Sequence, residues 1–133
     1  MGMEPLPDAI DTVRWLRERG CRLALLTNGG GAAQRAKIAR FGLEQLFDAI
    51  VIEGDVGFGK PDERVYRLAL EQLDVGPTDA WMVGDNLEWD VAAPQSLGVF
   101  GVWIDRRGSG LPEDAGAAPN LIVRALSDIK PLI

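Results

Sequence analysis

The fold is decided by the stretch Leu23-Ala24-Leu25-Leu26-Thr27-Asn28-Gly29, in which a short apolar run stops at polar residues and glycine. Such a run, ending in a glycine-rich loop, is typical of a strand that is buried on both faces. Apolar residues recur at helical spacing on either side of it, from about Asp8 to Arg19 and in residues 32–41. The order helix, strand, helix predicts an α/β domain.

The rest of the chain repeats this alternation. Further buried strands are expected at residues 49–52, 80–83 and 100–104. A helix is expected from Pro61 to about Leu73, because proline suits the first turn of a helix. Alternating strands and helices without hairpin signals predict a three-layer Rossmann-like fold, with helices on both faces of a parallel sheet. There is no internal repeat and no linker, so residues 1–133 are expected to form a single domain.

The composition excludes several classes of function. With 133 residues, of which 47% are hydrophobic and 26% charged, the chain can bury a core of its own. Its net charge of −6 would repel a nucleic-acid backbone, and no apolar stretch approaches the length of a membrane span. The single cysteine, Cys21, favours a reducing, cytoplasmic location. Because the chain contains no histidine, histidine general bases and histidine metal ligands are excluded.

Chemically suggestive residues follow the expected strands. Thr27 and Asn28 end the first strand, Lys60 lies in the loop after the second, and Asp85 ends the third, with Asp90 five residues further on. Ligands of open α/β sheets bind at these strand ends. Lysine can neutralise phosphoryl oxygens, a hydroxyl can hydrogen-bond them, and carboxylates can hold Mg²⁺. The set is therefore suited to phosphoryl transfer, although it contains no nucleophile.

Each of these residues alone also has an ordinary structural explanation. Thr27-Asn28 could be a strand end or a helix cap, and Lys60 a solvated lysine at a helix start. Asp85 and Asp90 could be a cap and a surface charge. Glu53, like the other loop charges, is expected to be structural or solvated. Three ordered motifs at three strand ends are nevertheless improbable by chance.

The three motifs carry a specific resemblance. Leu25-Leu26-Thr27-Asn28-Gly29, Gly59-Lys60-Pro61-Asp62 and Val83-Gly84-Asp85-Asn86 with Asp90 resemble the second, third and fourth motifs of the haloacid dehalogenase (HAD) superfamily, in the family's order. The similarity covers nearly the whole chain. It implies a hydrolase of the phosphatase type that acts on a small phosphorylated metabolite, with Mg²⁺ as its cofactor.

The resemblance also implies roles for individual residues. Thr27, Asn28 and Gly29 would bind the transferred phosphoryl group. Asn28 and Gly29 would do so partly through their backbone. Lys60 would be the catalytic cation that stabilises a phospho-aspartyl intermediate. Asp85 would bind the metal ion, and Asp90 would support it.

The family's first motif is missing from this sequence. That motif is an apolar strand followed by Asp-x-Asp, whose first aspartate is the nucleophile. The nearest candidate, Asp8-Ala9-Ile10-Asp11-Thr12, has the wrong spacing and no preceding strand. The chain is therefore expected to be the C-terminal part of a longer HAD-like core, without the nucleophile or the substrate-selecting cap, and to be inactive alone.

In the family this missing strand is central, between the strand that ends at Thr27 and the one that ends at Asp85. Its absence would leave two interior strand edges unpaired. An N-terminal segment could complete the sheet, the two orphan strands could close on each other, or copies of the chain could exchange segments in a homo-oligomer.

Three alternatives to a phosphatase remain. A haloacid dehalogenase would belong to the same family, but an uncharged pair typically replaces Gly84-Asp85 there. A response-regulator-like module also uses aspartate, threonine and lysine, but its acids precede the other two. A non-catalytic, self-associating module would agree with the missing nucleophile.

Overall fold

The computed structural model describes residues 7–133, so the first six residues of the expected domain lie outside it. The main helices are α1 (Pro7–Glu18), α2 (Gly31–Arg40), α3 (Glu53–Val56), α4 (Glu63–Leu73) and α5 (Ala93–Gln95). The strands are β1 (Ala24–Thr27), β2 (Ala49–Ile52), β3 (Trp81–Gly84), β4 (Phe100–Ile104) and β5 (Leu121–Val123). Short helical turns complete the chain: η1 (Leu43–Gln45), η2 (Pro77–Asp79), the π-helical η3 (Leu87–Ala92) and η4 (Leu126–Leu132). No helix of the described part is long and apolar enough to cross a membrane.

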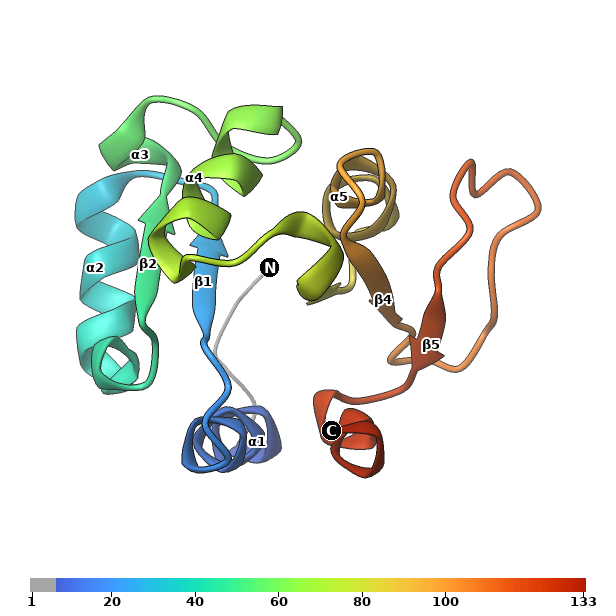
Figure 1. Cartoon of the computed structure of the whole chain (residues 1–133), viewed down its shortest axis with the longest axis horizontal. Coiled ribbons are helices and arrows are strands. Elements are labelled where there is room, and N and C mark those ends of the chain that lie inside the picture. The colour runs from blue at the N-terminus through green and yellow to red at the C-terminus, as the bar shows by residue number, and fades with distance from the viewer. Residues whose placement is uncertain (1–6) are drawn as a thin grey trace.

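The predicted α/β architecture with parallel strands is confirmed. Strand β1 pairs with β2, and β4 pairs with both β3 and β5, always in parallel. Helices cover both faces of the strands. Leu25 and Thr27 of β1 line a pocket beneath α1 and α2, whereas Ala24 and Leu26 pack against the cluster beneath α4. Figure 1 shows α2 and α4 beside β1 and β2, and α1 next to the C-terminal end of the chain.

The strands form two sheets and not one continuous sheet. Within residues 7–133, β1 pairs only with β2, and β3 pairs only with β4. The pattern of burial agrees with this division. No residue of β1 or β3 is fully buried, whereas β2 and β4 are mostly buried. In an intact sheet the middle strands would be the most buried ones. The division lies where the resemblance places a central strand, and it is compatible with the absence of that strand.

Helices hold the two sheets together, because apolar clusters on both faces cross the division. On one face, Leu16 of α1 packs with Val102, Ile104, Val123 and Ile129 from the C-terminal half. On the other face, the cluster beneath α4 includes partly buried residues of the C-terminal half such as Met82 of β3. Each fully buried side chain of this kind contributes about 1.5–3 kcal/mol. The helical layers therefore carry the connection that the backbone ladder lacks.

The start of α4 differs in detail from the prediction. The helix begins at Glu63, with Asp62 as its N-cap, and Pro61 lies before the cap. The Asp62 carboxylate accepts a hydrogen bond of 2.9 Å from the backbone N–H of Arg64. The Arg64 side chain also donates to Asp62 and holds the pKa of that carboxyl below its usual range. The cap is preferred because an aspartate oxygen satisfies an N–H that has no partner inside the helix.

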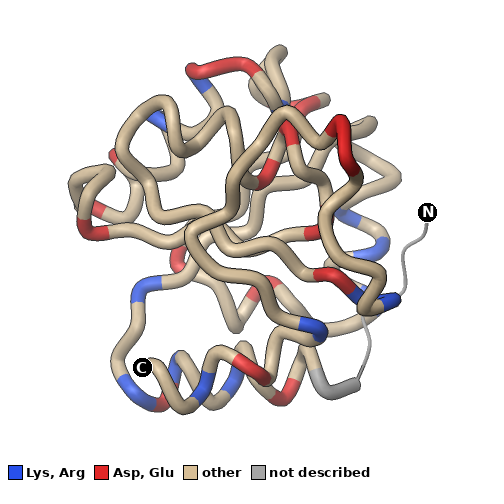
Figure 2. The backbone as a smooth tube through the Cα atoms, turned by 90° about the vertical axis from the view of Figure 1, so that its right-hand side faces the viewer, with Lys and Arg blue, Asp and Glu red and all other residues tan. Residues whose placement is uncertain are grey.

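Charged residues of both signs are spread along the backbone, as Figure 2 shows. Ion pairs at the surface, such as Arg67 with Glu63 and Arg14 with Asp11, join neighbouring turns of a helix. Asp11, from the rejected nucleophile candidate, therefore lies in α1 as a helix-surface residue. Exposed pairs of this kind contribute little to stability.

A matched pair of isoleucines tests the core of the C-terminal half. Ile129 is 3% exposed in the cluster with Leu16, whereas Ile122 of β5 is 45% exposed. We expect Ile129→Ala to lower the free energy of unfolding by about 2–5 kcal/mol, because it leaves a cavity. Ile122→Ala should lower it by about 0.5 kcal/mol or less. Urea denaturation measures both, and equal losses would show that the cluster is not the core.

Candidate active site

The loops that follow β1, β2 and β3 meet at one place. The loop after β1 contains Asn28 and Gly29, the loop after β2 and α3 contains Lys60, and β3 leads into the segment with Asp85 and Asp90. The side chain of Asn28 contacts the backbone of Lys60, and the side chain of Lys60 contacts Asp90. The structure thus connects residues of all three sequence motifs. Asn28 and Lys60 are 32 positions apart in the sequence, and Lys60 and Asp90 are 30 positions apart.

Lys60 and Asp90 form a largely buried ion pair. The Lys60 Nζ lies 3.1 Å from Asp90 Oδ1, and the two side chains are 15% and 6% exposed. The other carboxylate oxygen of Asp90 accepts a hydrogen bond of 3.0 Å from the backbone N–H of Asn86. A buried charge needs such partners, because it has lost its water. Asp90 is thereby committed to holding Lys60 and the loop after β3.

Gly84 leaves room for Asp90. A Cβ atom at this position would lie 2.2 Å from Asp90 Oδ2 and 2.3 Å from its carboxyl carbon, so no larger residue fits without a shift. The glycine at the end of β3 is thus required by close packing. This gives a physical reason for a glycine directly before Asp85.

Asp85 is placed differently from Asp90. It is exposed, and its carboxylate has no hydrogen-bond or ion-pair partner within the described part of the chain. Its backbone carbonyl accepts a hydrogen bond of 3.0 Å from Trp103 Nε1, which fixes the turn after β3. Asp85 is therefore the acidic side chain of the two that remains available for a ligand.

The donor set fits Mg²⁺ in its chemistry. Residues 7–133 contain no group of three or more acidic, cysteine or histidine side chains that could enclose a metal ion. Mg²⁺ does not require one, since it usually keeps several waters and binds one or two carboxylates. Asp85 could hold such an ion directly. Asp90 is engaged with Lys60 and Asn86, so it could support the ion only indirectly, through these contacts.

Asn28 and Gly29 are already engaged within the protein. Asn28 Nδ2 donates to the Lys60 carbonyl, and Asn28 Oδ1 accepts from the Lys60 N–H, both at 2.9 Å. The N–H of Gly29 donates to Glu53 Oε1 at 2.9 Å. A phosphoryl group would have to displace Glu53 to reach this N–H, and it would not meet a free Asn28 amide. Phosphoryl binding by Asn28 and Gly29 stays a prediction.

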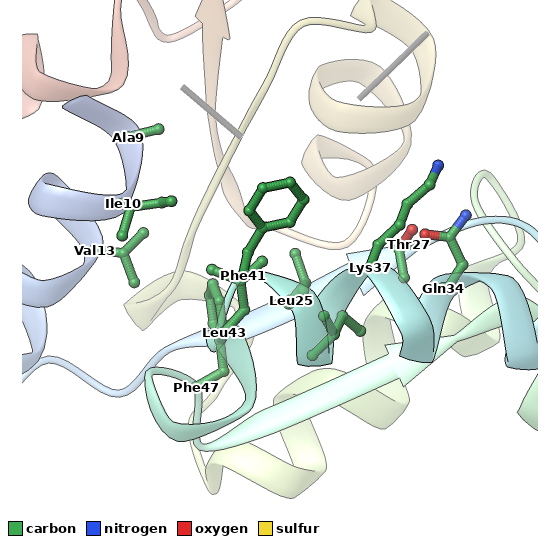
Figure 3. Close-up of a pocket in the computed structure, with 11 residues that line it drawn as sticks. Ala9, Ile10, Val13, Leu25, Thr27, Gln34, Lys37, Phe41, Leu43 and Phe47 are labelled. Atoms are coloured by element: carbon green, nitrogen blue, oxygen red, sulfur yellow. The ribbon is translucent and has the colours of Figure 1, made fainter. Parts of the chain in front are cut away.

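Thr27 lies at one end of a pocket of about 280 Å³, between α1 and α2 over β1 (Figure 3). Most of its lining is apolar, with Leu25, Phe41 and Phe47 among the larger side chains. Lys37 and Gln34 lie near Thr27 at the same end. The pocket contains none of the other predicted site residues, so it is separate from the contacts between Lys60 and Asp90.

Three further residues of this region make hydrogen bonds that the sequence pattern does not reveal. Tyr66 donates from its hydroxyl to the Trp89 carbonyl at 2.5 Å and so ties α4 to η3. Burial, together with the nearby charges of Asp90 and Glu88, raises the pKa of Tyr66 far above its usual value, so it stays a neutral donor. In the sequence, only the position of Tyr66 on the inner face of α4 indicates that this side chain is buried. Glu53, expected to be structural or solvated, accepts from the Gly29 N–H, and Trp103 donates to the Asp85 carbonyl.

Known proteins are similar to this chain in sequence and in fold. A phosphoserine phosphatase of Thermus thermophilus is 45% identical over 124 residues, which are 92% of this chain and 49% of that protein. (S)-2-haloacid dehalogenase 4A of Burkholderia cepacia is 32% identical over 127 residues, which are 96% of this chain and 54% of that protein. The crystal structure of a HAD phosphatase from Thermococcus onnurineus matches 96% of this chain and 57% of its own, with a TM-score of 0.86 and 34% identity.

The chain spans about half the length of the curated relatives it matches. The family model of the haloacid dehalogenase-like hydrolases matches residues 2–98, a range that includes every candidate site residue from Thr27 to Asp90. This chain therefore belongs to the haloacid dehalogenase-like hydrolase family.

Proposed function

We propose that this chain is the C-terminal part of a Mg²⁺-dependent phosphatase that hydrolyses phosphomonoesters of small metabolites through a phospho-aspartyl intermediate. The observation that carries the proposal is the arrangement at the strand ends. Lys60 and Asp90 form a largely buried pair, and Asp90 also accepts from the N–H of Asn86, the residue that follows Asp85. The Asp85 carboxylate is exposed and has no partner among the described residues. A held cation and an available carboxylate in the same set of loops are what binding of a phosphoryl group and a hard metal ion requires.

Each residue has a role in this proposal. Asp85 binds the metal ion, which when bound supplies charge neutralisation at the phosphoryl oxygens. Lys60 contributes its positive charge to the same oxygens, and Asp90 keeps the ammonium in place before substrate binds. The Thr27 hydroxyl, which donates to the Asn28 carbonyl at 3.3 Å in the structure, turns to hydrogen-bond the phosphoryl group. Because these groups are positioned before the reaction, they need little reorganisation during it.

The nucleophile belongs to a segment outside this sequence in our proposal. The support is the divided sheet: within residues 7–133 β1 pairs only with β2 and β3 only with β4, so a strand inserted between β1 and β3 would end between Thr27 and Asp85. The relatives, about twice as long as this chain, have room for such a segment. The 133-residue chain alone would then bind but not hydrolyse.

Two other functions are weaker candidates. A dehalogenase is favoured by relatives such as the Burkholderia cepacia enzyme, but Asp85 would be an unexplained free carboxylate there. A self-associating module is favoured by the second edges of β1 and β3, which have no strand partner within residues 7–133, since open edges invite pairing with another copy. Its signature would be an average mass that rises with protein concentration in sedimentation experiments.

Hydrolysis of p-nitrophenyl phosphate tests the proposal. A longer form that includes the preceding strand and Asp-x-Asp should release p-nitrophenol with Mg²⁺ and stop when EDTA removes the ion. The 133-residue chain should show no turnover, since it lacks the nucleophile. Turnover by this chain, or turnover by the longer form that survives EDTA, would contradict the proposal.

The metal ligand can be tested with a matched pair of acids. In the longer form, Asp85→Asn should lower kcat/KM on the order of 100-fold and raise the Mg²⁺ concentration needed for half-maximal activity. Glu88→Gln removes an exposed charge three residues away and should leave both quantities nearly unchanged. If both variants kept full activity, Asp85 would not be the ligand.

A further inference from the structure

The Asn28 side chain holds the backbone of Lys60 by both of its polar atoms. Its Nδ2 donates to the Lys60 carbonyl oxygen and its Oδ1 accepts from the Lys60 N–H, each at 2.9 Å. Two bonds from one planar amide to one residue fix both the position and the orientation of that residue. An asparagine is the shortest side chain that carries a donor and an acceptor on the same planar group.

The residues around this contact are closely packed. Gly59 lies between Asn28 and Glu53: a Cβ atom there would be 2.6 Å from Asn28 Oδ1 and 2.8 Å from Glu53 Oε2. Glu53 in turn accepts from the N–H of Gly29, and the N–H of Gly54 donates to the Gly29 carbonyl at 2.9 Å. The loops after β1 and β2 are thus interlocked, and Lys60 is carried by this interlocked pair.

The placement of Lys60 matters because its partner lies in the other half of the molecule. Asp90 follows β3, and no strand ladder joins β3 to β1 within residues 7–133. The Lys60 ammonium must cross this division to reach Asp90 at 3.1 Å. A lysine side chain has four rotatable bonds and loses much conformational freedom when it is held. A fixed backbone at Lys60 limits the positions that its ammonium can reach.

We propose that Asn28 is a positioning residue for Lys60: it fixes the lysine backbone so that the ammonium meets Asp90 at the candidate site. The amide of Asn28 therefore serves the lysine and not the phosphoryl group. This inference rests on the proposed function in one respect only, namely that Lys60 places its positive charge at the phosphoryl oxygens. The contact itself and its effect on the lysine can be measured without any substrate.

The reactivity of Lys60 tests this role in the 133-residue chain. Reductive methylation followed by mass spectrometry compares Lys60 with Lys37, an exposed lysine of α2, in the same sample. In the parent chain Lys60 should react more slowly than Lys37. Asn28→Ala and Asn28→Asp should raise the Lys60-to-Lys37 ratio by roughly fivefold, as expected from the loss of one or two hydrogen bonds. Asn28→Asp can accept from the Lys60 N–H but cannot donate to its carbonyl.

Asn120 provides a matched control. Its Oδ1 accepts from the Gly101 N–H at 2.8 Å, so it too is an asparagine that holds backbone, but in the C-terminal half at β4. Asn120→Ala should lower stability without changing the ratio. An unchanged ratio in folded Asn28 variants would overturn the proposal, and so would an equal rise in Asn120→Ala.

If the Asn28 variants fail to fold, hydrogen exchange in the parent chain tests whether Asn28 holds the Lys60 backbone. The Lys60 amide should exchange slowly, because Asn28 Oδ1 accepts its hydrogen; exchange as fast as that of an unprotected loop amide would overturn the proposal. Phosphatase activity enters none of these measurements. A longer form without activity would therefore refute the proposed function and leave this inference standing.

Discussion

The structure depends on how two separate parallel sheets are held in register with each other. Backbone ladders join β1 to β2, and β4 to both β3 and β5, but none crosses from β1 to β3 in residues 7–133. The connection is made instead by side chains. Leu16 of α1 packs into the C-terminal cluster, and Tyr66 and Lys60 reach Trp89 and Asp90 from the other half. The candidate site lies on this division, so what keeps the halves together also positions the site.

The Lys60–Asp90 pair is the most demanding of these contacts. Two charges that are largely removed from water are costly unless each keeps good partners, and removing one member of such a pair typically costs about 3–5 kcal/mol. Asp90 meets the condition through Asn86 and Lys60, and Gly84 provides the space. The Lys60 backbone is fixed by Asn28. A residue that is expensive to bury and carefully supported is a reasonable candidate for chemistry.

Much of this could be predicted from the sequence. The buried strands, the parallel α/β architecture and the three motifs are all visible in apolar runs that end in polar loops. The interlocking of the loops is not visible, because Asn28 meets Lys60 32 positions away and Glu53 meets Gly29 24 positions away. Periodicity likewise says that Tyr66 faces inward but not that its hydroxyl reaches Trp89. Proline is common in the first turn of a helix, but Pro61 lies outside α4, because Asp62 is the N-cap and the helix begins at Glu63.

Residue-resolved hydrogen exchange of β1 and β3 tests whether the two sheets are separate. In each of these strands, alternate amides point toward the paired neighbour and the others point toward the division. We expect slow exchange for the amides of β1 and β3 that face β2 and β4. In the 133-residue chain at low concentration, we expect fast exchange for the amides that face the division. Slow exchange on both edges of β1 and β3 would contradict this expectation, because those edges would then be paired.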